Sequence, residues 1–471
     1  MAKVMTHAGE DGQPRAAGWV LLVVSVVVLT VMAISFPRLV GGEGWLTGEK
    51  FLYLALIAYL GAAVLYVFSA ALRQSPLRAG AIALTRGGFL LHTTAIVVRW
   101  AGSGHAPLSN IYEMVLVFSW GVVALHEVAE RKFELPFLGA ITVPIAALAL
   151  VLMQVLPGEI RPLVPALQST WLQIHVTLAM LSYAGFTISF AVALLYLIKD
   201  GVTTRSFLSW CAALVLGVYG TIVATSVNGR LALTMPAWDS ATGEKVLLAP
   251  RQALLVPIAV LGWPFVIVLA LAAATLLLNV LARFSTQGQR WENPARRAFL
   301  AALVAQVLSL LLFMLKMHAG PYYVPQYGQS FEVHLAASPF LLAGVVTALF
   351  ASLAWEVLRW KHDVLVASLP SRDTLDGLIY KTVAISFPLL TLMIIAGAYW
   401  ANRTWGSYWS WDPKEDWALI TWLTYAAYLH MRLTRGWRGR RSAYFAIIGF
   451  GIVMFTFFGV TYLLPGLHAY A

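Results

Sequence analysis

The residues of this chain best suited to do chemistry lie in the run 405–417, which reads Trp-Gly-Ser-Tyr-Trp-Ser-Trp-Asp-Pro-Lys-Glu-Asp-Trp. It lies between two strongly apolar segments, and six of the 18 tryptophans fall between Trp400 and Trp422. Membrane interfaces attract Trp and Tyr, but this density exceeds what an ordinary helix end carries. The run therefore predicts a stacking platform suited to a planar metallocycle such as haem. We expect the platform to comprise Trp405, Tyr408, Trp409, Trp411, Asp412 and Trp417.

Part of the same run predicts a helix start. Asp412, Pro413, Lys414 and Glu415 suit the N-cap and the first three positions of a helix. The Asp412 carboxylate would accept a hydrogen bond from a free backbone N–H, and Glu415 would return one to the cap. A capped helix start would hold the neighbouring tryptophans rigidly.

The composition predicts an all-α, polytopic membrane protein. Of 471 residues, 60% are hydrophobic and only 11% are charged, which is outside the range of soluble domains. Apolar runs long enough to cross a bilayer recur along the whole chain. The first run lacks a clear signal-peptide cleavage site, which favours a retained helix. We predict about 13 transmembrane helices, at 17–36, 51–71, 82–99, 110–126, 137–155, 172–198, 207–227, 255–282, 298–317, 338–358, 382–400, 414–431 and 444–463.

The distribution of positive charge predicts the orientation. With the N-terminus in the cytoplasm, the inner segments carry 22 of the 32 lysines and arginines, as the positive-inside rule requires. The net charge of +11 therefore indicates membrane topology rather than a nucleic-acid partner. The Trp-rich run and the C-terminus would then both lie on the outer, periplasmic face.

Three of the ten histidines are the best candidates for iron ligands. His430 lies 18 residues after Asp412 on the same predicted helix, about 27 Å away at about 1.5 Å per residue. One iron cannot take ligands from both ends of that helix. His175 begins a span on the outer face, and His468 follows the last span back to that face. His175 and His468 are therefore the expected axial pair at the Trp-rich run, and His430 would belong to a second, inner site.

Cysteine chemistry is almost absent from the chain. The single cysteine, Cys211, allows no internal disulfide, and no Cys-x-x-Cys-His motif occurs. The protein is therefore not itself a c-type cytochrome. Any thiols in its chemistry would come from another molecule.

Several stretches resemble one known family. The run from Trp405 to Trp422 resembles the WWD signature of haem-handling proteins, and the continuation to His430 also agrees. The chain is most similar to the CcsA/ResC family, the integral-membrane half of the system II cytochrome c synthase. Three further stretches carry this resemblance, at 99–113, 171–183 and 466–470.

The resemblance implies an activity. Such proteins take haem b from the cytoplasmic side, pass it across the plasma membrane and present it at the WWD loop on the outer face. The Cys-x-x-Cys-His thiols of an apocytochrome c then add to the haem vinyl groups and form two thioether bonds. The resemblance thus predicts a haem lyase or synthase that would position haem and supply no other catalytic residue.

The resemblance also implies ligands and partners. By motif position, His175 and His468 would ligate the presented haem, and His430 would ligate haem in transit; the only metal is the haem iron. A CcsB/ResB-type membrane protein would supply the partner of His430, with His92 as the alternative within this chain. Thiol reductants would keep the cysteines of the apocytochrome reduced.

The chain departs from typical members of this family in length. Four extra spans lie between Lys199 and Lys381, and an even number preserves the sidedness of all that follows. We therefore expect N-terminal helices at 1–81, CcsA-like helices at 82–199, an inserted segment at 200–377 and a WWD core at 378–471.

Three other functions compete with this hypothesis. A CcmF- or CcmC-type component of the other cytochrome c maturation system would share the WWD loop, but those chains differ in length. A b-type electron carrier would usually pair its histidines in mid-membrane. A transporter of another aromatic solute would use the tryptophans as its binding site and would bind no haem.

Overall fold

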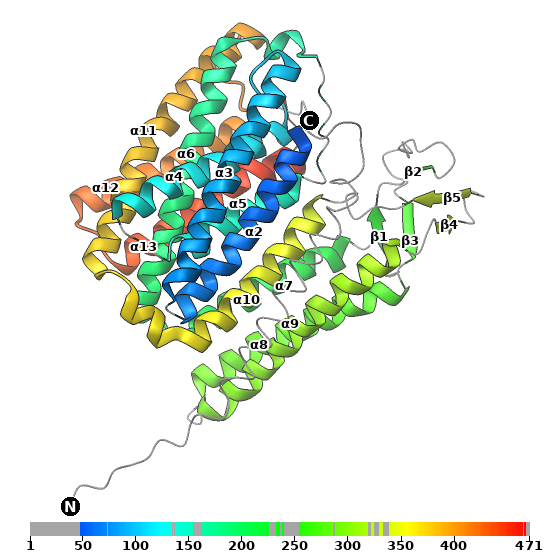
Figure 1. Ribbon diagram of the computed structural model, residues 1–471, viewed down its shortest axis with the longest axis vertical. Coiled ribbons are helices and arrows are strands. Elements are labelled where there is room, and N and C mark those ends of the chain that lie inside the picture. Colours follow the sequence, from blue (N-terminus) through cyan, green and yellow to red (C-terminus); the bar gives the residue numbers. More distant parts are fainter. Residues whose placement is uncertain are drawn as a thin grey trace, which may run out of the picture. The chain divides into compact units, whose positions relative to one another are not determined.

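The computed structural model of this chain describes residues 48–467, with gaps at 73, 134, 136, 154–155, 157, 159, 161, 226–231, 236–237, 240–253, 258, 286–287, 319–321, 325–328, 333–338 and 465 (Figure 1). These residues form two compact units. The middle unit is Thr203–His362, and the main unit combines 48–202 with 363–467.

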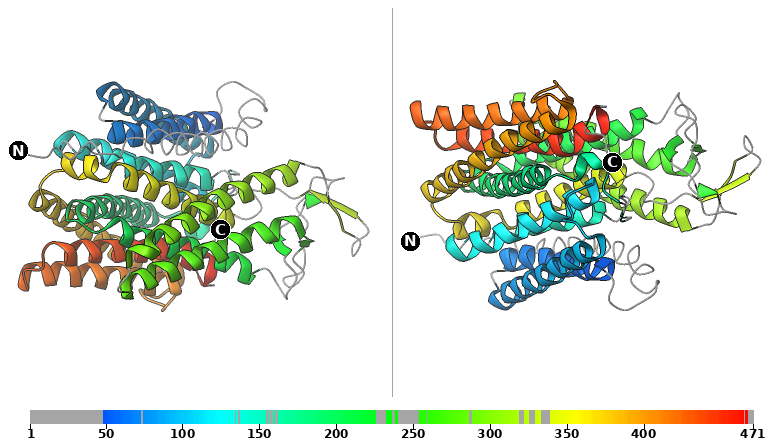
Figure 2. Two further views of the ribbon diagram at one scale, coloured as in Figure 1. Left: turned by 90° about the horizontal axis from the view of Figure 1, so that it is seen from below. Right: turned by 90° about the horizontal axis from the view of Figure 1, so that it is seen from above.

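The main unit is a bundle of helices. Figure 2 shows the α2–α3 pair and the α12–α13 pair on opposite sides of α4, α6 and α11. Its helices are α2 (Gly48–Leu72), α3 (Ser75–Ser103), α4 (Ile111–Phe133), α5 (Gly139–Met153), a 3-10 turn (Pro165–Leu167), α6 (Thr170–Lys199), α11 (Arg372–Trp405), α12 (Pro413–Thr434), α13 (Arg440–Met454), a π-helical turn (Phe455–Gly459) and α14 (Val460–Leu463).

The middle unit consists of four helices and short strands in their connections. The helices are α7 (Thr204–Thr225), α8 (Ala259–Phe284), α9 (Gly288–His318) and α10 (Pro339–Ser368), whose last residues belong to the main unit. Strand β1 (Ala232–Met235) pairs with β3 (Leu254–Pro257), and β5 (Gln329–Glu332) pairs with β2 (Trp238–Asp239) and β4 (Tyr322–Val324), all antiparallel. The sequence did not predict these short ladders.

The fold class predicted from the composition is confirmed. Twelve of the 13 predicted spans coincide with α2–α13, whereas the first, 17–36, lies outside the described residues. In the described part of the chain, nine helices are long and apolar enough to cross a membrane. Helix α5 is not among them because it has only 15 residues, with Pro144 inside it.

Helix α6 is the centre of the main unit. Its most apolar stretch is 78% buried, the largest share among the candidate spans, as expected for a helix that is hydrophobic on all sides. Phe186 stacks on Tyr425 of α12 with ring centroids 3.6 Å apart, and Phe190 stacks on Phe450 of α13 at 4.4 Å. These contacts fix α12, which follows the Trp-rich run, and α13 against α6.

Small residues bring α6 and α11 into close contact. Ser182 Oγ donates a hydrogen bond of 3.0 Å to the carbonyl of Ser386. A Cβ atom on Gly185 would lie only 2.0 Å from Ser386 Oγ. In membrane helices, such small residues allow backbones to approach and pack by van der Waals contact.

Acidic side chains hold together the end of the main unit opposite the Trp-rich run. Asp376 of α11 forms an ion pair of 2.6 Å with Arg432 and accepts the backbone N–H of Gly439 at 2.8 Å. Asp200, just after α6, pairs with Arg372 and Arg440. These bonds connect α6, α11, α12 and α13 at what we call the arginine end.

The contact at Gly185 yields a prediction about stability. Gly185→Ala should lower the stability of the folded protein by about 1–3 kcal/mol, because the added methyl must push α6 and α11 apart. Thermal unfolding in detergent measures the effect. Gly87→Ala in α3 is the matched control, because no described atom lies within 4 Å of its added Cβ. Equal melting temperatures for the two variants would contradict the prediction.

Candidate functional site

A cavity lies at the end of the main unit that carries the Trp-rich loop, which we define as 405–417. Residues from α4, α6, α11, α12 and α14 line it, with others from the 104–110 connection, the 3-10 turn and the π-helical turn. Four lining residues belong to the loop: Tyr408, Trp409, Lys414 and Glu415. The space between the lining residues is about 1200 Å³, a value that includes space open to the surroundings. The wall is mainly apolar, with a few polar groups, among them Ser109, Asn110, His175, Lys414 and Thr456.

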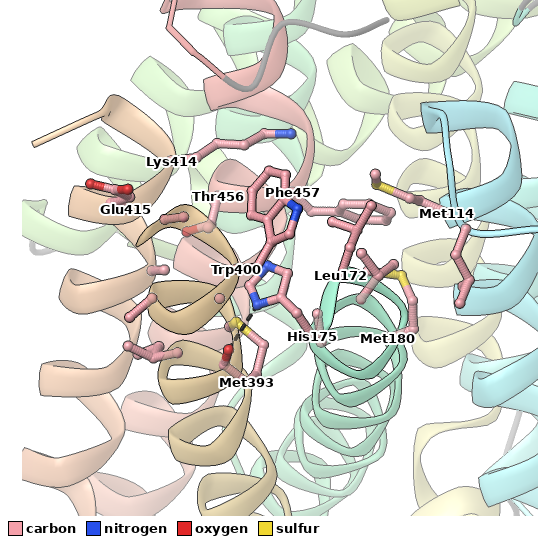
Figure 3. Close-up of a pocket in the computed structure, with 18 of the residues that line it drawn as sticks. Met114, Leu172, His175, Met180, Met393, Trp400, Lys414, Glu415, Thr456 and Phe457 are labelled. Carbon is pink, nitrogen blue, oxygen red and sulfur yellow. Dashed lines mark hydrogen bonds between the residues drawn. The ribbon is translucent and has the colours of Figure 1, made fainter. Parts of the chain in front are cut away.

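His175 is the histidine that reaches into this cavity (Figure 3). Its Nδ1 lies 2.7 Å from the carbonyl oxygen of Met393 on α11. A carbonyl only accepts hydrogen bonds, so Nδ1 carries the proton, and the lone pair of the neutral ring is on Nε2. A backbone carbonyl on one ring nitrogen is the usual support for a histidine that ligates a metal through the other.

Gly397 makes room for this imidazole. A Cβ atom at position 397 would lie 2.5 Å from His175 Nδ1 and 2.6 Å from Cε1, closer than side-chain contacts occur. The missing side chain lets the ring approach the backbone of α11 and reach the Met393 carbonyl one turn earlier. The sequence analysis did not identify Gly397 or Met393, because neither residue type indicates a ligand site.

The predicted helix start at Asp412 is confirmed as a capping box. Asp412 Oδ2 accepts the backbone N–H of Lys414 at 3.1 Å, and the Glu415 carboxylate returns a bond to the backbone N–H of Asp412 at 3.3 Å. Asp412 also has a second role, because its Oδ1 accepts the backbone N–H of Leu467 near the chain end. The cap thus joins the Trp-rich loop to the segment that follows α14.

Glu415 also holds the backbone on both sides of Trp411. Its Oε2 accepts the N–H of Ser410 at 2.7 Å as well as that of Asp412. Trp411 has a φ of 59°, a left-handed conformation that costs a residue other than glycine about 1–3 kcal/mol. The strain is therefore stored where two carboxylate hydrogen bonds oppose its release.

The six residues of the predicted platform lie in different environments. Tyr408 and Trp409 line the cavity with His175. Trp411 is 72% exposed and meets Trp409 edge-on, with centroids 6.1 Å apart. Trp405 packs edge-on against Trp400 at 4.8 Å, and Trp417 packs on Phe455 at 4.3 Å, whereas Asp412 forms the cap.

Trp400 is a wall residue that the platform prediction omitted. It is only 2% exposed, and its indole N–H donates to the carbonyl of Ala166 at 3.0 Å. It lies five residues before Trp405, whose ring it meets edge-on, and of these two tryptophans only Trp400 lines the cavity. Its position inside an apolar helix gave no sign of this role.

The other candidate histidines have different surroundings. His468 lies outside the described residues, although the preceding Leu467 is bonded to Asp412. His430 is exposed on α12. His92 is fully buried, with Nδ1 3.4 Å from the Tyr59 hydroxyl and Nε2 3.1 Å from the Leu116 carbonyl.

A buried ion pair fixes the connection between α3 and α4 beside the cavity. Arg99 Nε donates to Glu113 Oε1 at 2.8 Å, and Arg99 Nη1 donates to the Gly158 carbonyl at 2.9 Å. The other oxygen of Glu113 accepts the N–H and hydroxyl of Ser109, a lining residue. The 99–113 stretch therefore shapes one wall of the cavity.

Comparison with known proteins gives consistent relatives. A family model described as "Cytochrome C assembly protein" matches residues 108–272 and 204–468. A protein named cytochrome c biogenesis protein CcsA from Picosynechococcus is 34% identical over 81% of this chain and 84% of its own length. Proteins of the same name from Nostoc punctiforme and Microcystis aeruginosa are 33% and 31% identical over 91% and 92% of this chain and 97% and 98% of their own lengths.

Among solved structures, one titled "Cytochrome c Heme Lyase CcmF" aligns over 91% of this chain and 73% of its own at 14% identity. Its TM-score is 0.30, which is too low to support an argument about fold.

The hydrogen bonds of Glu415 yield a prediction about the loop. Glu415→Ala should free the backbone around Trp411 and destabilise the loop locally by about 1–3 kcal/mol, because the carboxylate hydrogen bonds to two backbone N–H groups are lost and the strain at Trp411 is released. Amide hydrogen exchange of residues 406–412 should then quicken about tenfold or more. Asp373→Ala is the control, since Asp373 is an exposed first-turn carboxylate of α11. Unchanged exchange in Glu415→Ala would show that other contacts hold the loop.

Proposed function

This chain belongs to the cytochrome c assembly family and is a CcsA-type protein, and from that premise we propose that it presents haem b for covalent attachment to apocytochrome c. The observation that carries the proposal is the cavity in which His175 meets Tyr408 and Trp409 of the Trp-rich loop. It combines a histidine, a side chain able to ligate iron, with flat aromatic groups at one end of a helical bundle.

His175 is the axial ligand that this proposal assigns to the cavity. The hydrogen bond from Nδ1 to Met393 supports the assignment, because it directs the ring and selects the tautomer whose Nε2 carries a lone pair. Neutral imidazole is an ordinary ligand of haem iron. The apolar wall would bury the hydrophobic face of the porphyrin and exclude water from the iron.

His468 is the second axial ligand in the proposal. Support comes from its neighbour in the chain: Leu467 is bonded to Asp412, at the base of the loop whose Tyr408 and Trp409 line the cavity. The same carboxylate that caps α12 would then bring the second imidazole to the haem. Two histidines would hold the iron, while Tyr408 and Trp409 would support the ring.

The chemistry needs positioning rather than a catalytic acid or nucleophile. Each thiol of the apocytochrome adds across one vinyl double bond, with sulfur bonding to one carbon and hydrogen to the other, so no electrons are exchanged. Holding the vinyl edges toward the incoming Cys-x-x-Cys-His segment turns a bimolecular addition into a reaction of oriented groups. Thiol reductants outside this chain would keep the two cysteines reduced.

His430 would serve a second, transient haem site in this proposal. Its exposure on α12 suits a ligand completed by a second membrane protein of the CcsB/ResB type. His92 suits that role less well, because both of its ring nitrogens are within hydrogen-bond reach of buried groups. The arginine end would face the cytoplasm of the plasma membrane, and the Trp-rich loop would face the periplasm.

Removing the His175 imidazole tests the proposal. The purified protein should carry haem with the absorption spectrum of a six-coordinate, bis-histidine iron, and His175→Ala should lose that spectrum. The same variant should stop cytochrome c maturation in cells, and added imidazole should restore part of both properties. His105→Ala is the control, because His105 lies in the 104–110 connection and does not line the cavity. Normal haem binding by His175→Ala would refute the ligand assignment, and wild-type protein purified without haem would count against the whole proposal.

A substitution at Gly397 tests whether its contact with His175 positions the imidazole, while the imidazole itself is kept. Gly397→Ala places a methyl 2.5 Å from His175 Nδ1, so the ring must leave the Met393 carbonyl. Loss of such support typically weakens metal affinity by about 10–100-fold, and haem titration of the apoprotein should show a loss in that range. Gly377→Ala in the same helix has no described atom within 4 Å and should bind as wild type does. Equal affinities in both variants would mean that the contact does not position the ligand.

A further inference from the structure

One cation of the cavity wall has no role in the function proposed so far. Lys414 is the second residue of α12 after the Asp412 cap, and it lines the cavity with His175. No other lysine or arginine lines the described cavity. Figure 3 shows its side chain extending from the start of α12 across the end of the cavity nearest the loop, whereas Met393 and its carbonyl lie deeper.

The acidic neighbours of Lys414 are bound to backbone groups. Glu415 accepts the N–H groups of Ser410 and Asp412, and Asp412 accepts those of Lys414 and Leu467. Asp412 acts on the ammonium group electrostatically. Within the described residues, however, the Lys414 side chain forms no ion pair or hydrogen bond. Its ammonium group therefore has no direct acceptor among the described residues, in a wall that is mainly apolar.

A half-buried ammonium in such a place is costly unless it meets an anion. Haem has two carboxylates on propionate arms at one edge of the ring, and its vinyl groups are on other edges. A lysine binds such a group as a compact point charge. The described cavity thus has one lysine and no arginine in its wall, which suits a ligand that carries its carboxylates on one side only.

We propose that Lys414 binds a haem propionate and thereby decides which edge of the porphyrin enters the cavity. The inference rests on the proposed function and deepens it: His175 sets the position of the iron, and Lys414 sets the rotation of the ring about the iron–imidazole axis. With a propionate at Lys414, the vinyl edge is held away from the start of α12. Lys414 is therefore a specificity-determining residue for carboxylated tetrapyrroles.

Haem dimethyl ester supplies the test, because it keeps the iron, ring and vinyl groups and lacks both carboxylate charges. Haem and its dimethyl ester are titrated separately into apoprotein in detergent, and binding is followed by the absorption of the histidine-bound iron. The ratio of the two dissociation constants reports the contribution of the carboxylates, since effects common to both ligands cancel.

Wild-type protein should bind haem about tenfold or more tightly than the ester, after correction for the ratio in detergent alone. Lys414→Met should lose this preference while keeping its affinity for the ester, which also shows that the variant folds. Lys414→Arg should keep most of the preference. Arg403→Met is the charge-matched control, because Arg403 is exposed on the same end and contacts Tyr399 rather than the cavity.

The outcomes separate the inference from the function it rests on. An unchanged preference for haem in Lys414→Met, with binding that still depends on His175, overturns the role of Lys414 and leaves the haem site standing. Equal weakening of both ligands also overturns it, because Lys414 would then act on the fold. Failure of wild-type protein to bind either ligand counts against the proposed function itself.

Discussion

The hydrogen bond between His175 and the Met393 carbonyl is the interaction on which the site depends. It exists only because α6 and α11 approach closely, and that approach needs Gly185 opposite Ser386 and Gly397 opposite the imidazole. Side chains at either glycine would separate the helices or displace the ring. The packing of small residues therefore decides the chemistry of the cavity, because it determines where the imidazole points and which nitrogen carries the proton.

The Trp-rich loop likewise depends on two side chains, the carboxylates of Asp412 and Glu415. Asp412 caps α12 and binds the chain near its end, while Glu415 holds the backbone on both sides of the strained Trp411. Charge-assisted bonds to backbone N–H groups are strong where water is scarce. The motif thus holds the backbone of the loop in place as well as presenting aromatic side chains. Only two of these aromatic side chains, Tyr408 and Trp409, line the cavity.

Several buried polar side chains elsewhere in the main unit have the hydrogen-bond or ion-pair partners that burial requires. Glu113 is bonded to Arg99 and Ser109, and His126 lies within reach of Tyr66, Glu130 and Thr142. These networks connect α2, α3, α4 and α5. They explain why histidines are poor guides to ligand sites in such a chain: His92 and His126 are fully buried in packing roles.

The features that depend on local pattern were predictable from the amino-acid sequence. Apolar runs of spanning length predicted twelve described helices, and the Asp-Pro-Lys-Glu order predicted the capping box, because hydrophobic length and helix-end bonding act over a few neighbouring residues. By contrast, three facts became apparent only in the folded chain: how α6 and α11 position the His175 imidazole, which aromatic residues line the cavity, and that Trp400, Gly397 and Lys414 belong to its wall. Those facts arise from contacts between residues more than 200 positions apart, such as His175 with Met393 and Ala166 with Trp400. Residue type and spacing along one helix do not indicate such long-range contacts.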